Sequence, residues 1–330
     1  MVLLIAIVTL ALVFDYTNGF HDTANAIATS VSTRAISPRL AVVMAAGLNL
    51  LGALVSTSVA KTVGEGIVNT DLVTLQVVMA ALVGAVVWNL VTWRFGIPSS
   101  SSHALFGGLI GAMIASAGIS GVIWSGVVEK IIIPMVGSPL IGFVAAWLLM
   151  TGLIWLVRKR QQGPVNTWFR RLQPISAGFM AFSHGANDAQ KTMGIIALAL
   201  FASGEIETFT IPLWVKIVCA LAMAAGTYSG GWRIIHTLGS RVIKLDPIHG
   251  FAAETAAASV IQAATHFGIP VSTTHTITAA IMGVGSTQRL SAVRWGVAGN
   301  IVTAWVLTLP AAGLVGAGVY FAGEAIRSLF

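Results

Sequence analysis

Two nearly identical motifs place a proline before a run of hydroxyl side chains. "FGIPSSSSH" occupies 95–103 and "FGIPVSTTH" occupies 267–275, each directly before an apolar segment. Proline suits the approach to a helix, and serine and threonine are favourable N-cap residues. The first turn of a helix also has unpaired N–H groups and the positive end of the helix dipole. Each motif therefore predicts a helix N-terminus that binds an anion.

The hydroxyl residues of the two motifs are the predicted anion ligands. They are Ser99, Ser100, Ser101, Ser102, Ser272, Thr273 and Thr274. Hydroxyl groups can donate hydrogen bonds to a tetrahedral oxyanion without any Arg or Lys. Such neutral donors hold a multivalent anion without preventing its release. The alternative is that each motif only caps an ordinary helix after a loop, and the presence of two matching copies favours the anion site.

Two aspartates form a second repeated pair. "NGFHD" ends at Asp22 and "HGAND" ends at Asp188, and each acid follows a glycine by three residues. A carboxylate inside a bilayer is costly and indicates a function. We expect the glycines to interrupt the helices and to expose carbonyl oxygens. Together with Asn25 and Asn187, the two acids would then bind a coupling cation, either Na⁺ or a proton.

Five further polar residues are candidates for a gate or for ion coupling. They are His103, His275, Glu254, Gln190 and Lys191. Lys191 follows Asp188 by three residues and can neutralise it across one helix face, which would make this aspartate partly structural. Glu254 has no charged twin in the first half and is a gate, a proton site or a partner for a hairpin group. The two histidines either brace the hairpins or take part in ion coupling.

The composition excludes a water-soluble protein. The chain has 330 residues, of which 56% are hydrophobic and 9% are charged, and its mean hydropathy is +0.88. Ordinary soluble domains carry about 25% charged residues. The net charge of +7 is scattered over short loops, which indicates membrane topology rather than nucleic-acid binding. Cys219 is the only cysteine, so an intrachain disulfide is impossible.

The hydropathy pattern predicts an all-α polytopic membrane protein. The apolar segments are 2–30, 38–60, 72–94, 98–118, 119–136, 138–157, 174–200, 211–232, 248–266, 269–287, 289–305 and 306–326. We expect the two segments that open with the hydroxyl motifs to enter the membrane and return on the same side. The prediction is then about ten spanning helices plus two re-entrant helical hairpins.

The order of the motifs predicts an inverted-topology repeat. The first repeat is 1–157, a basic linker is 158–173, and the second repeat is 174–330. All charged residues of the linker are basic, which places it in the cytoplasm and both termini outside. Each half then has five spans. Because five is an odd number, the two halves cross the membrane in opposite orientations. Duplicated, inverted halves with interrupted helices are typical of secondary transporters that bind substrate near the bilayer midplane.

The repeated motifs resemble a known family. "GFHDTANAIAT", "HGANDAQKTMG", "PSSSSH" and "PVSTTH" are similar to the signature regions of the inorganic phosphate transporter (PiT) family, in particular its compact bacterial low-affinity permeases. The resemblance covers both halves and implies symport of phosphate with a cation. It implies phosphate at the hairpin hydroxyls and the cation near Asp22 and Asp188. Two departures, His21 before Asp22 and Ala-Gln-Lys after Asp188, favour protons or a metal–phosphate complex over Na⁺.

The expected function is import of inorganic phosphate by a symporter that works by alternating access in the plasma (inner) membrane. The alternatives are a sulfate permease of the same fold, a passive anion channel and an intramembrane hydrolase that uses Ser with His103 or His275. We do not expect an enzyme, and we expect no cofactor other than co-transported H⁺ or Na⁺. The expected partners are phosphate and membrane lipid but no nucleic acid. The sequence is compatible with a homodimer and does not decide the oligomeric state. The chain has no GxxxxGK[ST] motif, which argues against an ATP-driven pump.

Overall fold

A computed structural model describes residues 1–329, and these residues are helical apart from turns and one isolated β-bridge between Val68 and Val122. The first half contains α1 (Val2–Ser32), α2 (Pro38–Val55), α3 (Ser58–Glu65), α4 (Leu75–Phe95), α5 (Ser101–Ala117), α6 (Trp124–Val127) and α7 (Ile133–Val157). The second half contains α8 (Gln162–Ala202), α9 (Leu213–Ser229), α10 (Trp232–His236), α11 (Pro247–His266), α12 (Thr273–Ser286) and α13 (Trp295–Arg327). The predicted all-α class is confirmed.

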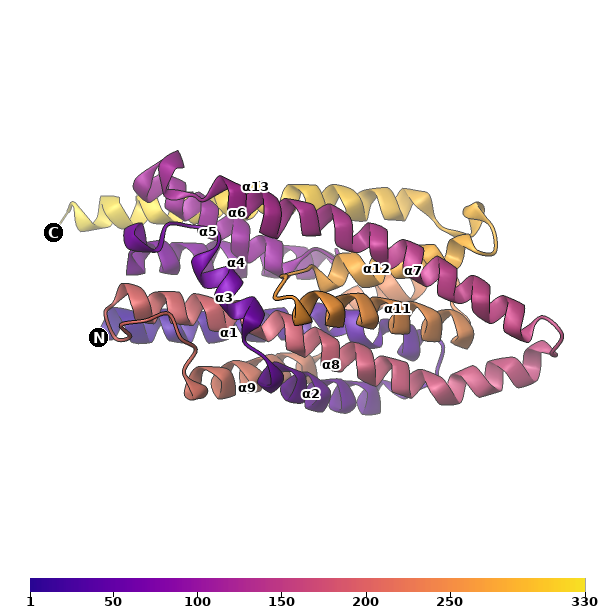
Figure 1. The fold of residues 1–330 in the computed structure, drawn as a ribbon. Helices are drawn as coiled ribbons and strands as arrows, with labels where there is room; N and C mark the ends of the chain where they lie inside the picture. The colour runs from indigo at the N-terminus through magenta and orange to yellow at the C-terminus, as the bar shows by residue number, and fades with distance from the viewer. Residues whose placement is uncertain (330) are drawn as a thin grey trace.

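The two halves contain their helices in the same order. Each begins with a long helix that carries a signature aspartate and ends with a long helix that contains a proline. Figure 1 shows both termini at one end of the bundle and the α7–α8 connection at the opposite end. Helices α1 and α8 pack against each other and run in opposite directions in this view.

The number of spanning helices differs from the sequence prediction. The structure has one continuous span over Trp124–Val157, of 34 residues, and another over Trp295–Arg327, of 33 residues. The predicted breaks between 119–136 and 138–157 and between 289–305 and 306–326 therefore do not occur, and Pro139 and Pro310 lie inside helices. Membrane helices tolerate an internal proline because neighbouring groups satisfy the freed carbonyl. Among residues 1–329, five helices are long and apolar enough to cross a membrane, and α9 together with Trp232–Arg241, bent by 59°, would make a sixth. The predicted count of about ten spans is therefore not confirmed.

The basic linker is shorter than expected. Helix α8 begins at Gln162 and continues without a break through Pro174, so most of the segment 158–173 is helical and only its first residues form a turn. The long polar start of α8 extends the helix that carries Asp188. The expected loop is thus largely a helical extension of the second half.

The hydroxyl motifs lie at the turns of two hairpins. The segments 98–118 and 269–287 do not enter and return by themselves, because each contributes only one arm, α5 or α12. The other arms are the preceding helices α4 and α11, which pack against α5 and α12. Glycines with positive φ, Gly96 at 66° and Gly268 at 67°, reverse the chain after the first arm. In Figure 1, α5 points toward the end with the termini and α12 toward the opposite end.

The glycines of the signature motifs are packing residues. A Cβ at Gly19 would lie 3.0 Å from the Cα of Gly226 in α9, and a Cβ at Gly185 would lie 2.6 Å from the Cα of Asn49 in α2. Close backbone approach at small residues is the usual way in which membrane helices associate. Helices α1 and α8 run unbroken through these glycines, so the expected helix break and its exposed carbonyl oxygens are absent.

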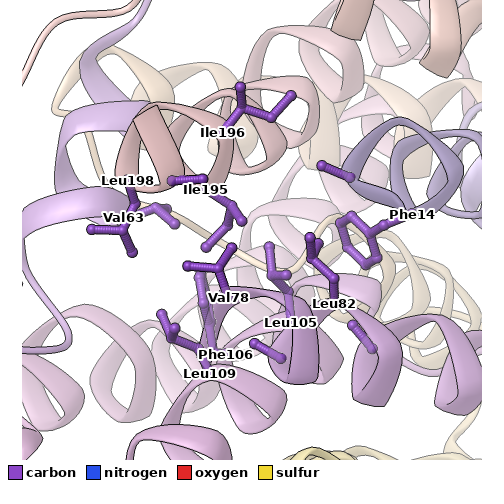
Figure 2. Close-up of a cluster of buried hydrophobic side chains, with 14 of the residues drawn as sticks. Phe14, Val63, Val78, Leu82, Leu105, Phe106, Leu109, Ile195, Ile196 and Leu198 are labelled. Carbon is purple, nitrogen blue, oxygen red and sulfur yellow. The ribbon is translucent and has the colours of Figure 1, made fainter. Parts of the chain in front are cut away.

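A buried apolar cluster fixes one hydroxyl motif between the two halves. Figure 2 shows Leu105 and Phe106 of α5 packed among side chains of α1, α3, α4 and α8. Phe14 from α1 and Ile195 from α8 belong to the same cluster, so both halves contribute to it. The start of α5 is therefore held by van der Waals packing against the two helices that carry the aspartates.

Candidate functional site

The two hydroxyl motifs start helices whose N-termini meet inside the protein. Ser100 is the N-cap of α5 and accepts a hydrogen bond from the N–H of His103 at 3.2 Å. Ser272 is the N-cap of α12 and accepts one from the N–H of His275 at the same distance. The rings of His103 and His275 lie 4.8 Å apart, centroid to centroid. The predicted convergence of two capped helix ends is thus present.

This meeting point is closed to solvent. The seven predicted anion ligands have exposed fractions between 0% and 3%. The signature acids are equally buried, Asp22 at 2% and Asp188 at 0%. A ligand reaches the centre of this conformation only after helices move.

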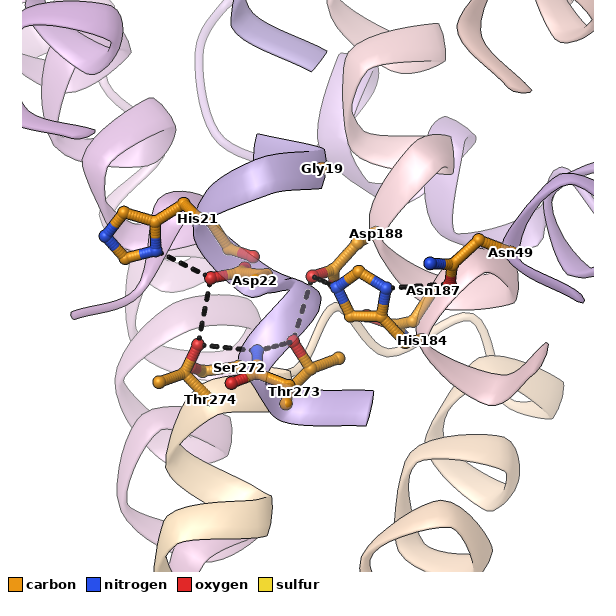
Figure 3. A network of polar contacts seen from close by, with 12 residues as sticks. Gly19, His21, Asp22, Asn49, His184, Asn187, Asp188, Ser272, Thr273 and Thr274 are labelled. Atoms are coloured by element: carbon orange, nitrogen blue, oxygen red, sulfur yellow. Dashed lines mark hydrogen bonds and ion pairs between the residues drawn. The ribbon is translucent and has the colours of Figure 1, made fainter. Parts of the chain in front are cut away.

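The hydroxyl groups and the acids form one site rather than two neighbouring ones (Figure 3). Thr273 donates to Asp188 Oδ2 at 2.9 Å, and Thr274 donates to Asp22 Oδ1 at 3.3 Å. Asn25 donates from Nδ2 to both threonine hydroxyls, at 3.3 and 2.9 Å. The predicted anion ligands of α12 therefore contact the predicted cation ligands of α1 and α8 directly. An anion and a cation would bind here within reach of each other, and each would lower the electrostatic cost of the other.

The hydroxyls of the first motif have different partners. Ser99 donates to Thr92 at 2.9 Å at the end of α4. Ser102 accepts a hydrogen bond from Lys191 Nζ at 2.6 Å. The Ser101 hydroxyl is buried and has no hydrogen-bond partner among residues 1–329. Of the four serines, Ser101 is the one whose hydroxyl has no partner at all, whereas the Ser100 and Ser102 hydroxyls only accept hydrogen bonds and can still donate one to an anion.

A lysine lies at the centre of the site, which corrects the expectation that neutral donors act alone. Lys191 forms an ion pair with Asp188 and is 1% exposed. Its Nζ also donates to the backbone oxygen of Val271 at 2.7 Å, just before α12. The spacing of three residues along α8 correctly predicted the pairing with Asp188. It did not predict that the ammonium reaches both hydroxyl motifs.

His184 is a site residue that the sequence analysis did not include among its candidates. Its Nδ1 lies 2.9 Å from Asn49 Oδ1, and its Nε2 lies 3.3 Å from Asp188 Oδ2. Asn49 donates its own amide to Thr227 at 3.0 Å, which orients Oδ1 as the acceptor toward His184. In neutral His184 the Nε2 lone pair then faces a carboxylate oxygen. A proton or a cation between the two atoms removes this repulsion.

Three side chains could hold such a cation. One ligand atom each of Asp22, His184 and Asp188 lies within 4.8 Å of the others, and all three residues are buried. Asn49 fixes the second ring nitrogen of His184, as is usual for metal-binding histidines. The spacing of four residues between His184 and Asp188 on one helix face was the sequence signal for this contact.

His21 takes over the position that asparagine has in the second half. Its Nε2 lies 3.0 Å from the Thr92 hydroxyl in α4, and the amide of Asn187 donates to the Thr265 hydroxyl in α11 at 2.8 Å. Each side chain thus ties its signature helix to the end of the first hairpin arm. His21 also bonds Asp22 through Nδ1 at 2.8 Å.

Two predicted coupling residues also contact backbone groups, and their role in coupling stays a prediction. The Oδ1 of Asn187 accepts from the N–H of Val271 at 3.4 Å, so its amide braces the α11–α12 turn in this conformation. Gln190 accepts the N–H of Val59 at 2.8 Å in the first turn of α3. These amides satisfy backbone groups at a turn and a helix end, where unpaired polar groups would be costly.

The two motif histidines meet edge to face, and one of them stacks on a tryptophan. His275 lies flat against Trp305 of α13, with ring centroids 4.0 Å apart. The indole of Trp305 donates to the backbone oxygen of Pro98 at 3.0 Å, in the other motif. Neither His275 nitrogen has a hydrogen-bond partner among residues 1–329. The packing supports bracing of the hairpins, and the unpaired nitrogens leave the predicted role in coupling as a prediction.

Glu254 forms a separate buried cluster outside the central site. Its carboxylate accepts hydrogen bonds from Thr29 in α1, from Ser176 in α8 at 2.5 Å and from Gln173 in α8 at 3.4 Å. These donors are all neutral. The acid does not contact a hairpin tip in this conformation, so the remaining predictions for it are a gate or a proton site.

Comparisons with known proteins agree with this geometry. A family model described as "Phosphate transporter family" matches residues 18–166 and 157–316. A protein of Rhizobium meliloti (strain 1021) described as "Probable low-affinity inorganic phosphate transporter" is 53% identical over 326 residues, which cover 98% of this chain and 97% of that protein. A protein of Bacillus subtilis (strain 168) with the same description is 45% identical, with 97% of each chain covered. A solved structure described as "The sodium-dependent phosphate transporter" has a TM-score of 0.90 and 26% identity, and the match covers 99% of this chain and 100% of that one.

Proposed function

Because the chain belongs to the phosphate transporter family, we propose that it is a symporter that imports inorganic phosphate by alternating access. The observation that carries this proposal is that the α12 N-terminus contacts both signature acids, while Lys191 links the α5 N-terminus to Asp188. Phosphate would bind between the tips of α5 and α12, where Ser101 has a free hydroxyl and the first N–H groups lack intrahelical acceptors. The coupled cation would bind at Asp22, Asp188 and His184.

Alternating access is supported by the burial of the site. A site with seven hydroxyl residues at most 3% exposed cannot exchange its ligand without a conformational change. The arms that form it diverge toward opposite ends of the bundle (Figure 1). Movement of one hairpin would then open the site toward one side of the membrane while the other hairpin keeps it closed.

The site favours phosphate over sulfate. Hydrogen phosphate carries a proton near neutral pH and can donate it to a carboxylate, whereas sulfate has no proton to donate. Asp22 and Asp188 offer such acceptors beside the hydroxyls of Thr273 and Thr274. The relatives described above are phosphate transporters by description. The proposed substrate is therefore phosphate and not sulfate.

Uptake of labelled phosphate into proteoliposomes tests the proposal. We expect accumulation above the external concentration when an inward gradient of H⁺, Na⁺ or a divalent metal ion is imposed, each gradient being applied separately. Excess unlabelled phosphate should abolish uptake of the label, and excess sulfate should leave it unchanged. Equilibration without accumulation under every gradient would instead identify a passive anion channel.

We also propose that this multi-pass protein lies in the plasma membrane with the α7–α8 turn in the cytoplasm and both termini outside. The basic residues Arg158, Lys159 and Arg160 cluster at that turn, at the opposite end from the termini. Arg160→Cys and Ser328→Cys test this, because both positions are exposed and the native Cys219 is buried. In intact cells an impermeant thiol reagent should label position 328 only, and labelling of position 160 alone would reverse the topology.

A further inference from the structure

The Lys191 ammonium group has the oxygen environment of a bound cation. Its Nζ contacts a carboxylate oxygen of Asp188, the hydroxyl of Ser102 at 2.6 Å and the backbone carbonyl of Val271 at 2.7 Å. An ammonium has three N–H donors, so all of them are satisfied. Carboxylate, hydroxyl and carbonyl oxygens are also the ligands that hard metal cations prefer. The three oxygens come from α8, from the start of α5 and from the turn just before α12, so this position joins α8 to both hairpins.

The internal repeat shows what occupies the equivalent position in the first half. Asp22 and Asp188 are 166 residues apart, and the same offset relates Asn25 to Lys191. Asn25 donates its Nδ2 to Thr273 and Thr274, while its Oδ1 is buried and has no donor among residues 1–329. The first half thus presents a carboxylate and an unused amide oxygen three residues apart. The second half presents a carboxylate that is already paired with the ammonium group of Lys191.

The charge balance of the two positions differs accordingly. Asp188 with Lys191 is a neutral pair, so the charge of Asp188 is already balanced inside the membrane. Asp22 has contacts to His21 and Thr274 but forms no ion pair with a Lys or Arg among residues 1–329. A lone carboxylate in this environment is costly and requires a mobile cation or a proton.

We propose that the Lys191 side chain replaces a free monovalent cation at the second of two related cation sites, so that Lys191 determines which ions the transporter requires. This inference rests on the proposed function and adds to it a residue that sets ion dependence. The tethered ammonium would neutralise Asp188 throughout the transport cycle without any Na⁺ being consumed. A mobile cation would then be required only at the Asp22 position, where Asn25 supplies the free oxygen and where His184 and the second carboxylate oxygen of Asp188 are also within reach.

Lys191→Asn tests this proposal because it recreates in the second half the Asp-x-x-Asn arrangement of the first. We expect phosphate uptake by this variant to be several-fold faster in NaCl than in choline chloride, and the Na⁺ response of the unchanged protein to be clearly smaller. Lys191→Met is the matched control, because it removes the ammonium without supplying an oxygen. Its uptake should be low in both salts.

A binding measurement keeps the test decisive if the variants do not transport. The midpoint of thermal unfolding of purified protein in detergent is measured with NaCl or choline chloride. Na⁺ should raise this midpoint for Lys191→Asn more than for the unchanged protein. Equal Na⁺ shifts for the two proteins, or no shift for the variant, would overturn the role of Lys191. Failure of the unchanged protein to take up phosphate under every gradient would instead overturn the proposed function, and the unfolding measurement would still decide about the lysine.

Discussion

Asp188→Asn is expected to abolish phosphate uptake and to lower the free energy of unfolding by about 3–5 kcal/mol, because it leaves a buried ammonium without its counter-charge. Lys191 has one carboxylate partner, and both residues are shielded from solvent. Asp188 also accepts the hydroxyl of Thr273 and faces His184 Nε2. The substitution therefore removes at once the ion pair, an acceptor for the α12 tip and a ligand of the predicted cation.

A second substitution separates the structural part of this effect from the functional part. Asp188→Asn combined with Lys191→Met removes both charges and should recover much of the lost stability, since replacing a whole buried ion pair costs far less than breaking it. The double variant should still fail to accumulate phosphate, because the cation ligand stays absent. Recovery of uptake together with stability would show that Asp188 serves only to balance Lys191.

Asp15→Asn is the matched control for the loss of a buried acid. Asp15 is as inaccessible as Asp188, but its carboxylate accepts a hydrogen bond from Thr192 at 2.8 Å and forms no ion pair among residues 1–329. We expect this variant to retain phosphate uptake. Equal loss of uptake in both variants would mean that any buried acid in these helices is required, and the specific assignment of Asp188 would fail. Uptake is measured in proteoliposomes and stability by thermal unfolding of the purified proteins.

The parts of the site that could be predicted from the sequence are those encoded by local chemistry and by the repeat. The paired proline–hydroxyl motifs predicted two capped helix N-termini, and Ser100 and Ser272 are the caps. Duplication in opposite orientations predicted that these ends converge, and the contact between His103 and His275 shows that they do. The acids were identified because a carboxylate in an apolar segment is rarely accidental.

The parts that were not predicted depend on contacts between residues far apart in the chain. The sequence did not reveal that the amide oxygens of Asn187 and Gln190 accept hydrogen bonds from backbone groups of other elements, the N–H groups of Val271 and Val59. Gly185 looked like a helix break because glycine destabilises a helix in water. In the structure its missing side chain admits the backbone of α2, and the helix continues. Local propensity cannot reveal which neighbour uses such a residue.

Glu254→Gln is expected to remove the response of phosphate uptake to an imposed pH gradient. The carboxylate is fully buried, its partners Thr29, Ser176 and Gln173 are neutral, and it forms no ion pair among residues 1–329. A proton is the simplest group that can cancel its charge. The offset of 172 between the hydroxyl motifs places Leu82 at the equivalent position of α4, where it packs in the apolar cluster of Figure 2. The fold thus accepts leucine at this position in one half, so a carboxyl group in the other half is better explained by proton binding than by packing.

The glutamine variant keeps the shape of the protonated acid but cannot release a proton. Its amide can still accept from Thr29, and the Ser176 hydroxyl can rotate to accept from the new NH₂ group. Exchange of labelled for unlabelled phosphate across the membrane should therefore continue, while accumulation driven by a pH gradient should fall to the level without a gradient. Glu129→Gln, at an exposed position between α6 and α7, is the control and should leave accumulation unchanged. Accumulation by Glu254→Gln that still follows the pH gradient would exclude Glu254 as the proton site and would move proton coupling to the central acids and His184.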